Sequence, residues 1–184
     1  ADSAALLAKV QSASALILDL RSYPKNVFAV ARLAAYFTER EMQNIPLYRY
    51  HVASPQQANY EQIFQKFASR QPGFAKPVIV LASRYSQSAN EHALGFLQSA
   101  HFPIMGEATS GANGTMNFLT VNGQSGQFSV SFTGDAVRQR DGSRFVGLGI
   151  EPDIQVARTQ AGMRAGRDEL LQAAQLYLQN KLKP

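Results

Sequence analysis

The segment Tyr85–His92 carries the residues of this chain whose types and spacing best suit chemistry. It holds Ser86 and Ser88, then Glu91, and it lies between an apolar run and a region of helical periodicity. A serine at a strand-to-helix turn places its hydroxyl at the exposed end of a sheet, beside helix N–H groups that can stabilise an oxyanion. This arrangement suits acyl transfer. The alternative is that Ser86 or Ser88 only caps the helix, since Ser88-x-x-Glu91 has the spacing of a capping box.

The sequence predicts two β–α units, one that contains the segment Tyr85–His92 and one earlier in the chain. The apolar run at 77–82 predicts a buried strand, and apolar residues at helical spacing predict a helix over 88–100. The same signals predict a strand at 15–20 and a helix over 27–39. The chain therefore repeats one β–α pattern.

The remaining segments extend this pattern to a layered α/β domain with a mixed sheet. After Pro103 the signals change to hairpins, with Asp141-Gly142 as one turn. The other predicted elements are a helix at 3–12, a strand at 46–52, a helix at 58–70, strands at 118–121 and 127–132, a short strand near Ile154 and a closing helix from about Asp168.

The composition bounds the class of protein. The chain has 184 residues, 45% hydrophobic and 17% charged, and no apolar run approaches the roughly 20 residues of a membrane-spanning helix. We therefore expect residues 1–184 to form one soluble globular domain. The absence of cysteine excludes disulfides, thiol catalysis and cysteine-ligated metals. No His, Asp or Glu spacing resembles a metal site, so we expect neither metal nor cofactor.

The charge and the first residues also exclude some classes of partner and signal. The formal net charge is +5, but the basic residues are dispersed, which argues against a nucleic-acid partner. Residues 1–7 carry neither the basic start nor the apolar stretch of a secretory signal. A signal, if the protein has one, is expected before residue 1.

Four short motifs occur in an order and spacing that resemble one enzyme family. They are Asp19-Leu20-Arg21, Ser88-Ala89-x-Glu91, Gly106-Glu107-x-Thr109-x-Gly111 and Gly149-Ile150-x-Pro152-Asp153-Ile154. The chain resembles, over about residues 15–180, the catalytic core of the C-terminal processing (tail-specific) serine peptidases, which include the tricorn-protease core. The resemblance implies a Clp-protease/crotonase-like core of repeated β-β-α units, and a longer protein of which this chain is the nucleophile-bearing part.

The resemblance also implies roles for residues around the serine. Ser88 takes the position of the nucleophile, and the backbone N–H of Ala89 that of one oxyanion donor. The second donor comes from the turn after Asp19-Leu20-Arg21, which usually reads Asn-x-Gly-Gly in the family. Here it reads Tyr23-Pro24-Lys25-Asn26, so the backbone N–H of Lys25 stands where the first glycine is expected.

The general base is the point at which the chain departs from the family. Ala112 stands where the processing-peptidase branch has its lysine, and Val146 stands where the tricorn-like branch has its glutamate. Without a base a serine hydroxyl is a poor nucleophile. The candidate substitutes are His92, one helical turn after Ser88, and Lys25, whose turn is expected to face Ser88. A histidine before residue 1 is a further expectation.

The expected partner is a polypeptide, bound extended beside a sheet edge. Asn113 and Gly111 are candidate substrate contacts, although the sequence favours a left-handed turn conformation for Asn113. We expect a serine-type peptidase that cleaves polypeptides by acyl transfer from Ser88. The alternative is a catalytically inactive family member that binds peptide or a cell-envelope partner. By resemblance, we expect a periplasmic or secreted location.

Overall fold

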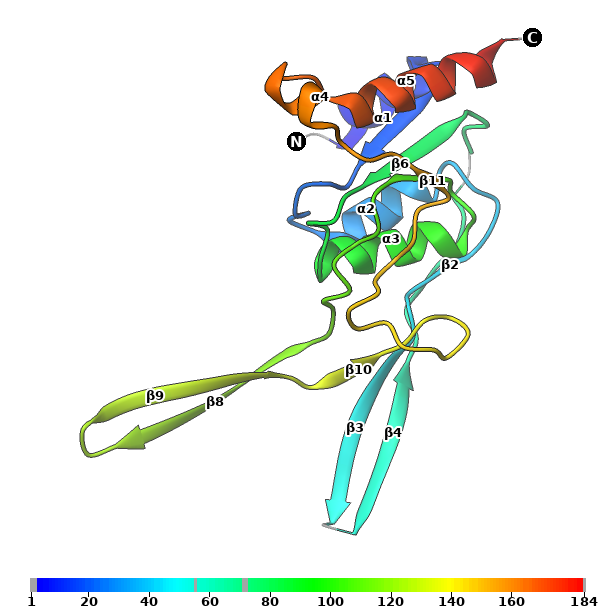
Figure 1. Cartoon of the computed structure of the whole chain (residues 1–184). Helices are drawn as coiled ribbons and strands as arrows, with labels where there is room; N and C mark the ends of the chain where they lie inside the picture. Colours follow the sequence, from blue (N-terminus) through cyan, green and yellow to red (C-terminus); the bar gives the residue numbers. More distant parts are fainter. Residues whose placement is uncertain (1–2, 55, 71–72, 184) are drawn as a thin grey trace.

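A four-stranded parallel sheet lies at the centre of the fold, in the order β1–β6–β7–β11 (Figure 1). The computed structural model describes residues 3–54, 56–70 and 73–183. The sheet strands are β1 (Leu16–Asp19), β6 (Val78–Ala82), β7 (Ile104–Gly106) and β11 (Ile154–Gln155). Because neighbouring strands are parallel, the loops that follow β1, β6 and β7 leave from the same edge of the sheet.

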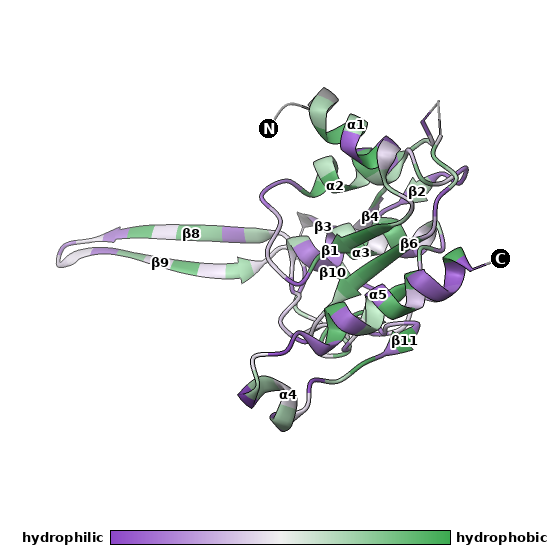
Figure 2. Cartoon of the chain, turned by 90° about the horizontal axis from the view of Figure 1, so that it is seen from above, coloured by the Kyte–Doolittle hydropathy of each residue, from purple (hydrophilic) through white to green (hydrophobic). Residues whose placement is uncertain are grey.

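Helices cover both faces of this sheet. Helices α2 (Val27–Ala34) and α3 (Ala89–Ser99) lie on one face, and α5 (Glu169–Leu182) lies on the other. Ile79 and Leu81 pack toward α5, and the alternate residues of β6 pack toward α2 and α3. Burial on both faces explains why β6 is apolar throughout, as Figure 2 shows.

The other elements are short or antiparallel. Helices α1 (Ser3–Ser12) and α4 (Gln160–Arg164) lie near the chain ends. The antiparallel strands are β2 (Met42–Gln43), β3 (Leu47–Ser54), β4 (Gln57–Ile63), β5 (Lys66–Phe67), β8 (Met116–Gly123), β9 (Gly126–Thr133) and β10 (Asp135–Val137). Strand β2 pairs with β5, and β10 joins the edge of the β3–β4 hairpin.

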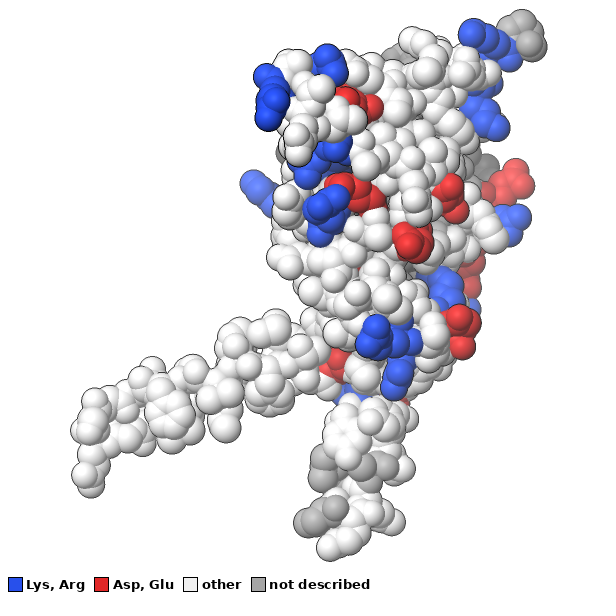
Figure 3. All heavy atoms as spheres, in the orientation of Figure 1, with Lys and Arg blue, Asp and Glu red and all other residues white. Residues whose placement is uncertain are grey.

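Two hairpins project from the body like arms (Figure 1). The β8–β9 arm pairs with no other strand in the part of the chain that is described. Residues 116–133 contain no charged side chain, and the arm is white throughout in Figure 3. Its cross-strand pairs Leu119–Val130 and Val121–Phe128 share one face with Phe132. All five are between 38% and 58% exposed, so this arm presents an apolar face to solvent.

The prediction of a helix over residues 58–70 is wrong. The segment forms β4 and β5. Strand β4 pairs along its length with β3, which places Tyr60 against Tyr50 with ring centroids 5.0 Å apart. The apolar residues Ile63 and Phe67 pack against the main core from these strands. Tertiary pairing therefore overrides the local helical spacing.

The α/β class and most other elements are confirmed. The predicted β–α units at 15–39 and 77–100 are present, although α2 ends at Ala34. The parallel and antiparallel strands occupy separate sheets. The predicted strands at 118–121 and 127–132 are the inner parts of β8 and β9. None of the described helices is long and apolar enough to cross a bilayer.

Candidate active site

Ser88 lies at the turn between β6 and α3, in a backbone conformation that ordinary helix caps do not need. Its φ is 51° and its ψ is −113°. The N-cap residues Asn26 and Thr159 have φ of −149° and −95°, in the extended region. A positive φ is uncommon and strained for a residue with a side chain. Capping alone therefore does not account for the geometry of Ser88.

The buried side chain of Glu91 stabilises this turn through hydrogen bonds. The Ser88 N–H donates to Ala112 O (2.7 Å) and to Glu91 Oε2 (3.2 Å), which is one half of the expected capping box. Glu91 Oε1 accepts from Thr109 Oγ1 (2.6 Å) and from the Gly111 N–H (2.7 Å). Burial raises the pKa of Glu91, and these hydrogen bonds oppose the rise. Glu91 thus both caps α3 and supports the loop after β7.

The third and fourth sequence motifs meet each other beside this turn. Thr109 Oγ1 accepts a hydrogen bond from the Ile150 N–H at 2.8 Å. Gly111 has φ +66°, and a Cβ there would lie 2.6 Å from Leu148 N and 2.7 Å from Gly147 N. Only glycine fits this approach. The contact explains the Thr109-x-Gly111 spacing as packing that positions the loop.

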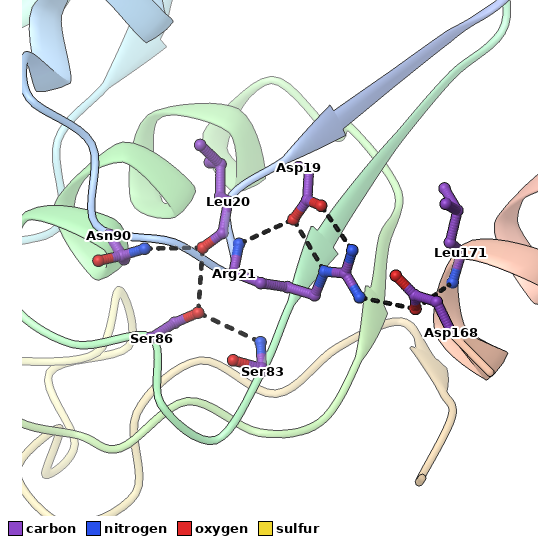
Figure 4. Close-up of polar contacts among 8 residues, drawn as sticks. All are labelled: Asp19, Leu20, Arg21, Ser83, Ser86, Asn90, Asp168 and Leu171. Carbon is purple, nitrogen blue, oxygen red and sulfur yellow. Dashed lines mark hydrogen bonds and ion pairs between the residues drawn. The ribbon is translucent and has the colours of Figure 1, made fainter. Parts of the chain in front are cut away.

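A second set of contacts brings the turn after β1 to Ser88. Leu20 O accepts from Asn90 Nδ2 (2.7 Å) and from Ser86 Oγ (3.1 Å) (Figure 4). Asn90 Nδ2 also donates to Ser22 O (2.8 Å). This anchoring places the Tyr23 hydroxyl within 3.3 Å of Ser88 Oγ, to which it donates a hydrogen bond.

Asp19 and Arg21 connect the turn after β1 to helix α5. Arg21 forms a two-pronged ion pair with Asp19 (2.9 and 2.6 Å) and reaches Asp168 Oδ1 at 2.8 Å (Figure 4). Asp168 also accepts from the Leu171 N–H and so caps α5. Hydrogen bonds from Arg21 lower the pKa of both carboxyl groups. These residues tie the turn to α5, away from the reacting groups.

Ser88 stands between two cavities. The larger, of about 770 Å³, is lined by Ser88, the 111–114 loop, the base of the β8–β9 arm, β10 and Val146. The smaller, of about 410 Å³, is lined by Ser88, Ala89, Lys25 and His92 among others. The structure thus brings the predicted nucleophile, oxyanion donors and candidate bases to one place.

Within the described ranges, neither the His92 ring nor the Lys25 amine makes a hydrogen bond with Ser88 Oγ, although the His92 backbone N–H donates to Ser88 O at 2.9 Å as part of α3. His92 Nε2 pairs with Gln65 Oε1 at 3.0 Å, and the ring stands edge-on to Phe96 with centroids 5.4 Å apart. Burial lowers the pKa of His92, which favours the neutral ring at pH 7. Lys25 is exposed at the rim of the smaller cavity.

Asn113 lines both cavities. Its Oδ1 accepts from the Gly114 N–H at 2.7 Å. The left-handed conformation predicted for Asn113 is wrong, because Ser88 and His101 are the non-glycine residues with a positive φ in the described part of the chain. Asn113 Nδ2 is buried and has no hydrogen-bond partner among the described residues. A buried unpaired donor is costly unless a ligand satisfies it, which fits the substrate-contact interpretation.

A comparison with known protein families identifies the family of this chain. The sequence profile of peptidase family S41 matches residues 1–156. The chain belongs to peptidase family S41. The predicted resemblance to the tail-specific and tricorn-like peptidases is therefore confirmed.

Solved structures agree with the S41 fold. A peptidase candidate from Parabacteroides merdae is 24% identical, with a TM-score of 0.73 over 95% of this chain and 55% of its own. The photosystem II D1 C-terminal processing protease is 23% identical, with a TM-score of 0.53 over 82% of this chain and 36% of its own. The tricorn protease is 16% identical, with a TM-score of 0.64 over 95% and 16%. The S41 chain thus spans at most about half of these structures. No curated protein sequence matches it.

The two positions at which S41 relatives are expected to carry a base both face the larger cavity. Ala112 and Val146 line it together with Ser88. Tyr23, which contacts Ser88 directly, was missed from the sequence because its contact joins two turns that lie 65 positions apart. Asn90 was missed too, although a polar residue in the first turn of an apolar helix was a usable signal.

Proposed function

We propose that this S41 chain is the serine-type peptidase core of its protein, with Ser88 as the nucleophile. The observation that carries the proposal is the positive φ of Ser88, at a strand-to-helix turn between two cavities. Backbone strain of this kind persists where surrounding contacts enforce it, and it is common at active sites. Here Glu91 and Ala112 enforce it through the Ser88 N–H.

The proposed reaction is acyl transfer to Ser88. Ser88 Oγ attacks the carbonyl carbon of the scissile peptide bond, and its proton passes to a base. The N–H groups of Ala89 and Lys25 stabilise the negative charge that develops on the carbonyl oxygen. The base proposed within this chain is Lys25 or His92, which share the smaller cavity with Ser88. Collapse of the intermediate then expels the amine, and water releases the acyl group.

The substrate is proposed to bind as an added strand. Strand β10 pairs with β3 along one edge, its other edge pairs with no strand of the described residues, and its residues 135–137 line the larger cavity. A peptide along the free edge would gain backbone hydrogen bonds and would pass Ser88. Asn113 Nδ2 would then have a peptide carbonyl as acceptor, and Gly111 keeps the neighbouring backbone close.

Labelling with a fluorophosphonate tests the nucleophile. We expect the wild-type chain, and the full-length protein where the chain alone is inactive, to form an adduct at Ser88. Ser88→Ala should abolish the adduct, and Ser110→Ala should retain it, because the Ser110 hydroxyl donates to Ser86 O instead. A folded full-length protein without a Ser88-dependent adduct would sink the peptidase proposal.

A second candidate function is peptide binding without cleavage. Ala and Val at the two expected base positions, both facing the cavity, favour it. In this case labelling fails, whereas a fluorescent peptide still binds and Asn113→Leu weakens the binding. A periplasmic or secreted location is likewise a proposal, supported by the family resemblance and testable by fractionation of the native cell.

A further inference from the structure

Two arginines form a cross-strand pair beside the proposed nucleophile. After β10 the chain reverses at Asp141–Gly142, where the Gly142 N–H donates to Gln139 O and the Gln139 N–H donates to Ser143 O. The reversal places Arg138 opposite Arg144 in an antiparallel bridge. Residues directly opposite each other share one face, with Cβ atoms about 5 Å apart, and like charges there are destabilising. Both residues are exposed, so solvent screens this repulsion and its cost is small.

Neither guanidinium has a partner that offsets this cost. Among the described residues, Arg138 and Arg144 make no side-chain hydrogen bond or ion pair. By contrast, nearby Arg140 donates to Gln43 O and Gly95 O. Figure 3 shows basic side chains gathered at the root of the two arms, in the region of β10 and its following loop.

The paired arginines line the same cavity as Ser88 and Asn113. The one carboxylate among the residues lining this cavity is Asp135, and it is already engaged. Asp135 is 5% exposed, lies 3.4 Å from Arg49 Nε and accepts from Thr115 Oγ1. The free charge of the cavity is therefore that of Arg138 and Arg144, both positive.

The remaining lining is apolar or neutral, and includes Met116, Val137 and Val146. Arg138 and Arg144 are both exposed and both line this cavity, so they attract an anion to it. The fork of N–H donors on each guanidinium matches the two oxygens of a carboxylate. The polypeptide offers this chemistry from two sources, an Asp or Glu side chain or its own terminal carboxylate.

We propose that Arg138 and Arg144 form a carboxylate-binding subsite, which selects polypeptides that carry a carboxylate a few residues from the bond at Ser88. The inference rests on the proposed function, since it takes the occupant of the cavity to be a polypeptide. The carboxylate lies between the two guanidinium groups and relieves their repulsion, while the apolar walls hold the adjoining residue.

Equilibrium binding to the Ser88→Ala protein tests the subsite without cleavage. Four fluorophore-labelled hexapeptides of otherwise neutral sequence carry either Glu or Gln at one inner position and end in either an acid or an amide. We expect at least one carboxylate source to tighten binding by about tenfold over the carboxylate-free peptide. The Glu-amide peptide and the Gln-acid peptide separate the side chain from the terminus.

Substitution of the pair provides the decisive comparison. Arg138→Gln with Arg144→Gln should abolish the preference, and Arg138→Glu with Arg144→Glu should reverse it toward a Lys-bearing peptide. Arg164→Gln is the matched control, because Arg164 is exposed on α4 and does not line the cavity. Circular dichroism checks that each variant is folded. If a double variant does not fold, the two single variants are measured in its place.

The outcomes separate this inference from the peptidase proposal. Equal binding of all four peptides, no binding of any of them, or a preference that survives in the double Gln variant overturns the carboxylate subsite. An adduct at Ser88 without any carboxylate preference overturns the subsite alone. A preference without an adduct supports the subsite and contradicts catalysis by Ser88.

Discussion

The Tyr23 hydroxyl donates a hydrogen bond to Ser88 Oγ across 3.3 Å, from a turn 65 positions earlier in the chain. The contact fixes the direction of one lone pair of the serine oxygen, and leaves the serine proton free to point elsewhere. Tyr23 thus acts on the orientation of the nucleophile.

Tyr23→Phe removes this contact and leaves the ring. We expect the rate of fluorophosphonate labelling at Ser88 to fall about three- to tenfold, since one neutral hydrogen bond is worth about 0.5–1.5 kcal/mol. The Tyr23 side chain is 61% exposed, so the thermal midpoint should not change measurably. Tyr85→Phe, at an exposed tyrosine not bonded to Ser88, is the control. Equal labelling rates for both variants would contradict the orienting role.

Asn90→Ala tests the anchoring of the turn itself. Asn90 is 1% exposed and donates to Leu20 O and Ser22 O. In the variant, Leu20 O keeps its hydrogen bond from Ser86 Oγ, whereas Ser22 O loses the one from Asn90. We expect the free energy of unfolding to fall by about 2 kcal/mol, because the buried side chain makes two hydrogen bonds that the variant loses. Urea denaturation measures it, with exposed Asn180→Ala as control. A loss as small as that of the control would show that Asn90 does not anchor the turn.

Glu91→Gln tests the buried carboxyl group through pH. Burial raises the pKa of Glu91 in the folded state above its ordinary value of 4.5. The folded state then binds more protons than the unfolded state from about pH 4.5 up to the raised pKa, so this group's contribution to stability is lost as pH rises through that window. The Gln variant lacks this contribution. We expect the wild-type free energy of unfolding, minus that of the variant, to decrease as pH rises from 4.5. A flat difference would contradict the raised pKa.

The sequence predicted the parts of this site that depend on local spacing. The turn that carries Ser88, its neighbour Glu91 and the loop at Gly111 follow from β–α periodicity and short motifs. The sequence could not predict the role of Tyr23. That role depends on hydrogen bonds from Asn90 and Ser86, which place a turn distant in the chain beside α3. The Arg138–Arg144 pair required the register of the 138–144 hairpin, although the Asp141-Gly142 turn was predicted. The 58–70 segment failed because its partner strand, and not its own spacing, decides its structure.

Shortening the β8–β9 arm tests whether it contributes to the stability of the body. Replacing residues 118–131 with Asn-Gly, a favoured two-residue hairpin turn, keeps the Asn117–Phe132 pair. The arm pairs with no other strand in the described chain, so we expect the free energy of unfolding to change by less than about 0.5 kcal/mol. Removal of the exposed apolar face should also reduce association at high concentration. Loss of folding in the shortened chain would contradict this prediction.

Ala112→Lys tests whether a lysine at the position where the processing peptidases are expected to carry their base activates Ser88. Ala112 is exposed within the cavity that Ser88 lines, so a lysine side chain fits there without displacing the core. Its carbonyl already accepts from the Ser88 N–H at 2.7 Å, which fixes the backbone beside the nucleophile. An installed amine that reaches Ser88 Oγ can take its proton, and a general base typically contributes about 10²–10⁴-fold. We therefore expect Ser88 labelling to accelerate by at least about tenfold at alkaline pH, where the amine is neutral. Ala112→Met carries a long side chain without the amine and should give no acceleration, and Ala112→Lys with Ser88→Ala should not label. An Ala112→Lys chain that labels at the wild-type rate at every pH would show that the missing base alone does not limit Ser88.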